Sequence, residues 1–165
     1  MKKCLLAAVL LLGLTLSSCA LFTVQKTKPP EGAYKVYFPV TGERAGTDAV
    51  DFEYRLPVGA APTVTELVSA LLAGPGTADF VSPLPPHVTL RAAQLGADGQ
   101  LHLDLSEQYG GLSGIDLTLA NACFALTLCQ LPPVNNVYIT VEGEPIPYQS
   151  LQTLRTEDLI LPTAP

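Results

Sequence analysis

The chain has 165 residues, with 15 Asp and Glu against 9 Lys and Arg and a formal net charge of −6. Nucleic-acid binding is not expected of such a chain, because neutralising phosphates requires clustered basic side chains. The length suits one domain with a modest core, and the sequence contains no internal repeat.

Residues 1–18 have the layout of a secretory signal peptide, in which two lysines precede an uncharged apolar run over residues 4–16. That run is too short for a membrane-spanning helix, which needs about 20 apolar residues. It ends in "LSSC", which resembles a bacterial lipobox and so implies a diacylglyceryl group on the thiol of Cys19 and cleavage after Ser18. An ordinary signal peptide with a chance cysteine is the alternative. We therefore expect an extracytoplasmic protein that is lipid-anchored to the outer face of the cytoplasmic membrane.

The lipidated Cys19 begins a polar, proline-containing tether that is predicted to span residues 19–33. Fully extended, this tether reaches less than about 50 Å, so the domain is expected to stay close to the membrane. Two segments with alternating apolar and polar residues follow, "YKVYF" (34–38) and "VDFEYRL" (50–56). Each predicts a β-strand.

The segment "PTVTELVSALLAG" (62–74) predicts the first helix. Thr63 and Glu66 have the spacing of a capping box, which supplies partners for two amides at the helix N-terminus. Gly74 suits a left-handed C-cap, and the proline after it prevents continuation. A stiff joint with four prolines lies within "LLAGPGTADFVSPLPPHVTL" (71–90), and we interpret it as a strut that fixes the crossing to the next strand.

After the joint, "VTLRAAQL" (88–95) and "QLHLDL" (100–105) flank "GADG" and predict a β-hairpin. A second helix is predicted from a cap at Ser113 to about Leu131, and "VNNVYITVEG" (134–143) predicts the last strand. The order β-β-α-β-β-α-β predicts an α/β fold of the α+β type. In it, two helices pack on one face of a small mixed or antiparallel sheet within a single small domain.

The second helix is apolar on two opposite sides, which means that both sides are covered. One side is expected to pack on the sheet and consists of Ile115, Leu119, Ala122, Leu126 and Cys129. The other provides the candidate interaction surface, formed by Leu117, Phe124, Leu128 and Leu131. Coverage of this side by the chain itself, through its C-terminal tail (148–165) or the first helix, is the preferred interpretation, and coverage by a partner or another copy is the alternative.

Two cysteines remain in this helix, Cys123 and Cys129. Six residues of helix place them about 120° apart, so they cannot form a disulfide without unwinding the helix. We interpret them as small buried hydrophobes rather than redox or metal-binding groups. Neither His87 nor His102 has a usable metal-ligand spacing to these thiols, so no metal and no cofactor are expected.

His102, Asp104 and Ser106 alternate along one predicted strand and therefore share a face. Side chains two residues apart on a strand stand about 6.6–7 Å apart. A catalytic triad needs contacts of about 2.6–3.2 Å with His between Ser and Asp, whereas Asp is in the middle here. A solvated strand face is the preferred interpretation. We expect no catalytic residues, no small-molecule substrate and no enzymatic activity.

Several motifs occur in a characteristic order: "ELVSALLAGP" (66–75), the prolines of the joint, "DLS" (104–106) and "VNNVYITVEGEPI" (134–146). In this order and spacing the chain resembles the GerM-type (GerMN) domain of sporulation and spore germination proteins over residues 34–147. The resemblance implies a fold similar to the ring-building motifs of secretion and sporulation channel complexes. It also implies a lipoprotein that helps to assemble an envelope-spanning complex between mother cell and forespore.

The anchor and the resemblance together predict a membrane-anchored lipoprotein with a non-catalytic GerMN module. Its expected role is to assemble or stabilise an envelope or sporulation complex through protein–protein contacts. The expected partners are the membrane, through Cys19, and proteins of that complex or further copies of the chain. A surface lipoprotein that binds a solute or a cell-wall ligand and is unrelated to sporulation is the alternative.

Overall fold

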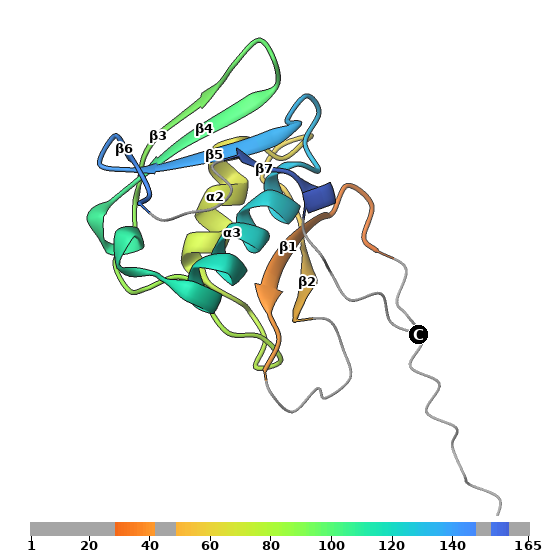
Figure 1. Ribbon diagram of the computed structural model, residues 1–165. Coiled ribbons are helices and arrows are strands. Elements are labelled where there is room, and N and C mark those ends of the chain that lie inside the picture. Colours follow the sequence, from red (N-terminus) through yellow and green to blue (C-terminus); the bar gives the residue numbers. More distant parts are fainter. Residues whose placement is uncertain (1–28, 42–48, 148–152, 159–165) are drawn as a thin grey trace, which may run out of the picture.

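The computed structural model describes residues 29–41, 49–147 and 153–158 (Figure 1). The predicted signal peptide, Cys19 and most of the tether lie outside the described residues. The described elements follow the predicted order β-β-α-β-β-α-β, and two short strands then follow. The predicted α+β class is confirmed.

The strands divide between two sheets, whereas the sequence pattern predicted one. A two-stranded antiparallel sheet and a five-stranded mixed sheet are present, in which β5 runs parallel to β4 and antiparallel to β6 and β7. The first sheet consists of β1 (Tyr34–Pro39) and β2 (Val50–Arg55), and the second of β3 (Leu90–Leu95), β4 (Gln100–Leu105), β5 (Asn136–Val141), β6 (Glu144–Pro145) and β7 (Thr153–Leu154).

Two helices, α2 (Val64–Ala73) and α3 (Gly114–Leu128), pack on one face of the five-stranded sheet (Figure 1). The hairpin of β1 and β2 packs on the helices from another side, and its most extensive helix contacts are with α3. Helix α3 is therefore enclosed by both sheets and by α2. None of the helices in the described part of the chain has the length and apolar character needed to cross a bilayer.

Helix α2 begins as predicted, with the Thr63 hydroxyl accepting a hydrogen bond from the Glu66 amide at 3.2 Å. The carboxylate of Glu66 does not return to Thr63, since it accepts from the Val58 amide at 2.7 Å and so holds the preceding loop. The helix ends at Gly74, whose φ of 79° is the positive value that favours glycine.

Helix α3 follows a short 3-10 helix, η1 (Glu107–Gly111), and ends three residues before the predicted Leu131. Ser113 precedes its first residue as predicted, but the Ser113 side chain makes no capping hydrogen bond. A second 3-10 helix, η2 (Thr156–Asp158), contacts α3 from the C-terminal segment.

The hairpin β3–β4 turns through Gly96–Gly99, as "GADG" predicts. Gly99 has a φ of +80°, and a Cβ atom there would lie 2.7 Å from the backbone oxygen of Pro133. In β4, Leu101, Leu103 and Leu105 all point into the core and are at most 1% exposed. Strand β3 is the edge of the sheet and is largely exposed.

The outer edge of β1 is closed by side chains near the end of α3. The Thr127 hydroxyl accepts a hydrogen bond from the Tyr37 amide at 3.0 Å. The side-chain amide of Gln130 accepts from the Lys35 amide at 3.0 Å and donates to the Lys35 carbonyl at 2.6 Å. The short hairpin is thus fixed on the helix by polar as well as apolar contacts.

The C-terminal segment returns to the domain at β7, which pairs with β5, and Leu154 is buried there. Residues 148–152 and 159–165 of the predicted tail lie outside the described residues.

Candidate functional site

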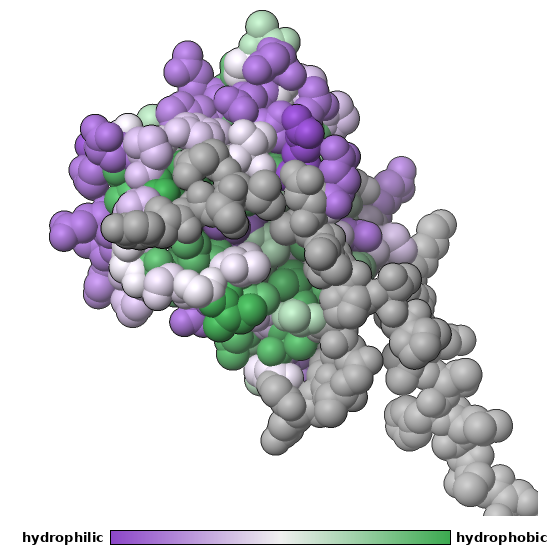
Figure 2. Space-filling view, viewed as in Figure 1, coloured by the Kyte–Doolittle hydropathy of each residue, from purple (hydrophilic) through white to green (hydrophobic). Residues whose placement is uncertain are grey.

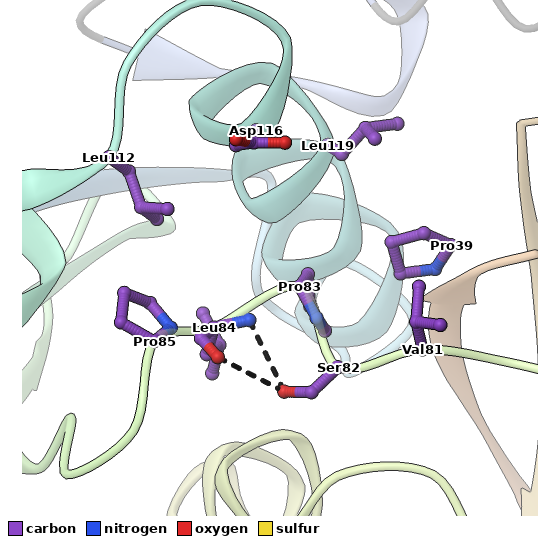
Figure 3. A pocket seen from close by; sticks show the side chains of 9 residues that line it. All are labelled: Pro39, Val81, Ser82, Pro83, Leu84, Pro85, Leu112, Asp116 and Leu119. Carbon is purple, nitrogen blue, oxygen red and sulfur yellow. Dashed lines mark hydrogen bonds between the residues drawn. The ribbon is translucent and has the colours of Figure 1, made fainter.

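An apolar groove opens between the proline-containing joint and the N-terminal half of α3 (Figure 3). It encloses a volume of about 300 Å³. Its walls come from the end of β1, from the joint and from the start of α3. Leu112, which lies between η1 and α3, completes the wall. The apolar lining consists of Pro39, Val81, Pro83, Leu84, Pro85, Leu112 and Leu119.

The joint forms the rigid wall of this groove. Val81 donates its amide to the Pro39 carbonyl at 3.0 Å, and Thr41 donates to the Asp79 carbonyl at 3.0 Å, which continues the end of β1 with a short bridge. The Ser82 hydroxyl accepts from the amide of the leucine two residues later at 3.3 Å. The prolines fix φ along this wall, so the groove is largely pre-formed.

The start of the joint is held by a second set of contacts. Glu53 of β2 forms an ion pair with Arg55, and its carboxylate accepts from the Gly76 amide at 3.0 and 3.1 Å. Arg55 in turn donates to the Gly74 carbonyl at 2.6 Å. Because the Glu53 side chain is only 12% exposed, these contacts are largely shielded from water and fix the crossing from α2 to the groove.

Exposed aliphatic side chains extend the groove onto the surrounding surface. Val81 lines the groove and is 47% exposed. Ile115 lies one helical turn before the lining residue Leu119, on the same side of α3, and is 68% exposed. Figure 2 shows hydrophobic residues gathered on this face, in the lower part of the view. Contiguous apolar surface that stays exposed to solvent is a feature of interaction sites.

Among the described residues that line the groove, Asp116 is the one that carries a charge (Figure 3). It lies in the first turn of α3, where the helix dipole stabilises a negative charge. Its carboxylate makes no hydrogen bond or ion pair with another residue in the described part of the chain. A groove with mostly apolar walls and one carboxylate is suited to binding an apolar segment.

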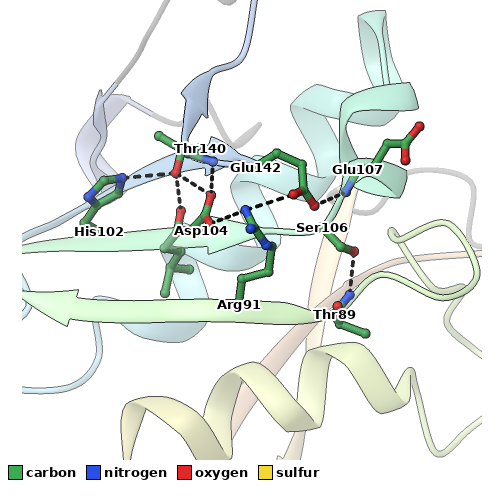
Figure 4. A network of polar contacts seen from close by, with 10 residues as sticks. Thr89, Arg91, His102, Asp104, Ser106, Glu107, Thr140 and Glu142 are labelled. Carbon is green, nitrogen blue, oxygen red and sulfur yellow. Dashed lines mark hydrogen bonds and ion pairs between the residues drawn. The ribbon is translucent and has the colours of Figure 1, made fainter.

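A polar network lies on the outer face of the five-stranded sheet (Figure 4). The Asp104 carboxylate accepts from the Gly143 amide at 2.7 Å, from the Thr140 hydroxyl at 2.9 Å and from Arg91 at 2.8 Å. His102 Nε2 lies 3.1 Å from the same Thr140 hydroxyl oxygen. Strands β3, β4 and β5 are thereby joined across their surface.

Burial alone would raise the pKa of Asp104. The hydrogen bonds from Gly143 and Thr140 and the nearby Arg91 and His102 outweigh that effect and lower the pKa below its usual 3.8. The carboxylate is therefore ionised at neutral pH and stabilises the sheet.

The three side chains that resembled a triad do not form one. The Ser106 hydroxyl accepts from the Thr89 amide at 2.9 Å and donates to Gln108 at 2.7 Å, so it is directed away from His102. The hydroxyl that meets His102 belongs to Thr140, which is only 2% exposed and cannot reach a substrate.

The prediction of an interaction surface on the second helix is wrong. Phe124 and Leu128 are 1% and 0% exposed, and Phe124 packs edge-on against the ring of Tyr109 with centroids 5.8 Å apart. Leu117 and Leu131 are partly buried against the same core. The chain itself covers this side of α3, as the preferred interpretation expected, because α3 lies between two sheets rather than on one.

The two cysteines of the second helix lie as free thiols, Cys123 fully buried and Cys129 half-buried. Burial raises the pKa of the Cys123 thiol to about 12. Among the described residues there is no group of three or more His, Cys, Asp or Glu side chains that could hold a metal ion.

The groove itself was not predicted from the sequence. Its proline wall was interpreted only as a strut, and its other wall includes Leu119, which was expected to pack on the sheet. The available signal was the uncharged run "FVSPLPP" (80–86), since apolar side chains between prolines cannot all be buried in a loop.

The profile of the Germane family, described as sporulation and spore germination, matches residues 35–147. Comparison with curated protein sequences gives no match.

Three solved structures share the fold at low sequence identity. The tandem GerMN domains of the sporulation protein GerM from Bacillus subtilis match at 16% identity, with a TM-score of 0.63 over 77% of this chain and 47% of that one. This chain thus spans about half of the tandem structure. The first GerMN domain of the same protein matches at 17% identity, with a TM-score of 0.61 over 76% and 98% of the two chains. A candidate lipoprotein from Clostridium perfringens matches at 18% identity, with a TM-score of 0.51 over 82% and 94%.

Proposed function

Because this chain belongs to the Germane family of sporulation and spore germination proteins, we propose that it is a lipid-anchored, extracytoplasmic module that helps to assemble a protein complex of the cell envelope. Its GerMN-type domain acts by binding other proteins and carries out no chemistry. The observation that carries this proposal is the open apolar groove beside the joint.

The sequence before the domain supports the anchor. Residues 1–18 have the three-part layout of a signal peptide, and "LSSC" places a cysteine at position 19 as a lipobox requires. Two or more acyl chains on Cys19 would hold the protein at a membrane almost permanently. The structural likeness to a candidate lipoprotein from Clostridium perfringens agrees with this localisation.

The described side chains favour a docking role over a catalytic one. In the polar cluster around Asp104, the carboxylate is already bonded to groups of the neighbouring strands, so these contacts are structural. The groove offers aliphatic walls, and one of its lining residues, Val81, is 47% exposed; apolar side chains of this kind form the core of protein interfaces.

The anchor is tested by labelling cells with radioactive palmitate. The wild-type protein should incorporate label and be processed, and Cys19→Ala should abolish both. Label that survives this substitution would refute the anchor.

Docking is tested by crosslinking and affinity capture of the full-length protein from growing and from sporulating cells. Ile115→Asp at the rim of the groove should remove the captured proteins. Leu95→Asp, at a 40% exposed leucine on the edge strand, is the matched control and should retain them. Capture that is unchanged by Ile115→Asp would show that the groove is not the docking surface.

A further inference from the structure

We infer that the groove receives a second copy of this chain, through the loop that follows β2. This inference rests on the proposed docking function and names the occupant of the groove. The loop comprises residues 56–61, "LPVGAA", and is called the Val58 loop below.

The Val58 loop presents aliphatic side chains to solvent from a fixed position. Leu56 is 62% exposed and Val58 is 97% exposed, the highest value among the exposed large hydrophobic residues of the described chain. The Val58 amide donates to the Glu66 carboxylate of α2 at 2.7 Å, so the loop is tied to a helix. An aliphatic side chain held this way can enter a pocket without a large cost in loop ordering.

The Val58 loop and the groove lie at opposite ends of the β1–β2 hairpin. Arg55, which precedes the loop, pairs with Tyr34 at the start of β1, whereas Pro39 of the groove pairs with Val50 at the other end. Five residues of strand separate these ends by about 17 Å. One molecule therefore cannot insert its loop into its own groove, but it can offer the loop to a neighbour.

The two surfaces match in chemistry and in size. The Val58 loop contains no charged residue, so its burial removes no ion from water. Among the described residues, the groove is apolar apart from Ser82, whose hydroxyl bonds to Leu84, and Asp116, which is exposed to solvent. A cavity of about 150 Å³ is enough to bind benzene. The volume of about 300 Å³ is therefore sufficient for the side chains of Leu56 and Val58 together.

A contact between two different surfaces of the same chain is head-to-tail, so each bound copy leaves one loop and one groove free. Such contacts generate rings or open chains, depending on the rotation between neighbours. Two aliphatic side chains in one groove form a small interface, which favours association only where copies are concentrated. The predicted anchor on Cys19 would provide that concentration. The segment from Cys19 to residue 29 spans about 33–36 Å when extended, longer than the hairpin, so anchored copies can lie side by side.

Disulfide crosslinking tests this contact in the full-length, membrane-bound protein. Two differently tagged copies are expressed together, one with Val58→Cys and one with Ile115→Cys, and both with Cys129→Ser so that only the introduced thiols react. Mild oxidation should give at least about tenfold more mixed dimer than the control pair of Val58→Cys with Leu95→Cys, because a disulfide requires Cβ atoms within about 4.5 Å. A mixed dimer no more abundant than the control would overturn the inference. So would Val58→Cys homodimers of equal abundance, since they indicate a two-fold contact.

A complementation test gives a second measure. Val58→Asp removes the loop contact and Ile115→Asp removes the groove contact, so either variant alone should form no crosslinked multimers with an amine-reactive reagent. Expressed together they should form a dimer and nothing larger, because one intact loop and one intact groove remain. Multimers formed by Val58→Asp alone would contradict the inference.

These results separate the inference from the function on which it rests. If Ile115→Cys crosslinks to a different protein and not to Val58→Cys, the groove docks another partner. The inference then fails and the docking function stands. If Ile115→Asp leaves both self-crosslinking and captured partners unchanged, both fail.

Discussion

Replacement of Phe124 by alanine tests the central position of α3 in the fold. Phe124 is 1% exposed, and its ring packs edge-on against Tyr109, whose hydroxyl donates to Asn121 at 2.7 Å. Removing a buried Phe ring costs about 3–5 kcal/mol of unfolding free energy, through lost burial and the cavity left behind. We expect the upper part of that range, because an edge-on aromatic pair contributes about 0.5–1.5 kcal/mol beyond its burial.

The measurement is urea-induced unfolding of the purified protein, followed by circular dichroism and repeated as a thermal melt. Total stabilities of about 5–15 kcal/mol are usual, so Phe124→Ala should still fold while its melting temperature falls by at least about 10 °C. Ile115→Ala, at a 68% exposed position on the same helix, is the matched control and should change stability by less than about 0.5 kcal/mol. A loss below about 1 kcal/mol for Phe124→Ala would refute the burial of this side of α3 between two sheets.

Three further outcomes are expected. Iodoacetamide at about pH 8 should label Cys129 well before Cys123, because burial raises the pKa of the Cys123 thiol to about 12 and the thiolate is the reactive form; equal labelling rates, measured by mass spectrometry, would contradict this. Asp104→Asn should destabilise the protein at neutral pH. The folded pKa of Asp104 lies below its ordinary value of 3.8. The difference in unfolding free energy between wild type and variant should therefore be constant well above pH 3.8 and shrink as the pH falls through the folded pKa. A difference that grows toward acid pH would contradict a lowered pKa of Asp104. Gly99→Ala should lower the free energy of unfolding, measured in urea, by about 1–3 kcal/mol. The reason is that φ of Gly99 is positive and that a Cβ atom there would lie 2.7 Å from a backbone oxygen. The control Gly111→Ala, where a Cβ atom would have open space, should have little effect.

The order of elements could be predicted from the sequence because its signals are local. Alternation predicts β1, β2 and β4, and the pairing of Thr63 with the following turn predicts the start of α2. The second half of the capping box, in which the Glu66 side chain returns to the Thr63 amide, was predicted but does not form. Glu66 reaches the Val58 amide instead, and which amide a carboxylate meets depends on the path of the preceding loop.

The division into two sheets could not be predicted, because the alternation of apolar and polar residues identifies a strand but does not determine which other strand it pairs with. For the same reason the sequence left two interpretations open for the second helix. Its apolar residues surround the whole helix, and such a pattern fits either a partner or enclosure by the same chain. The groove was missed for a related reason, since its walls come from Pro39, from the joint and from Leu119, which are brought together only by the fold.

The polar closure of the β1 edge has a consequence for local unfolding. An amide on the outer edge of a two-stranded sheet ordinarily exchanges with solvent as fast as the strand frays, and an isolated hairpin is only marginally stable. Here the amide of Tyr37 donates to the fully buried hydroxyl of Thr127, so its hydrogen is released only when the end of α3 separates from the strand. The exchange rate of this one amide therefore reports how often the helix and the hairpin come apart. Because Pro39 and Leu119 lie on these two elements, that rate also measures how often the groove loses its shape.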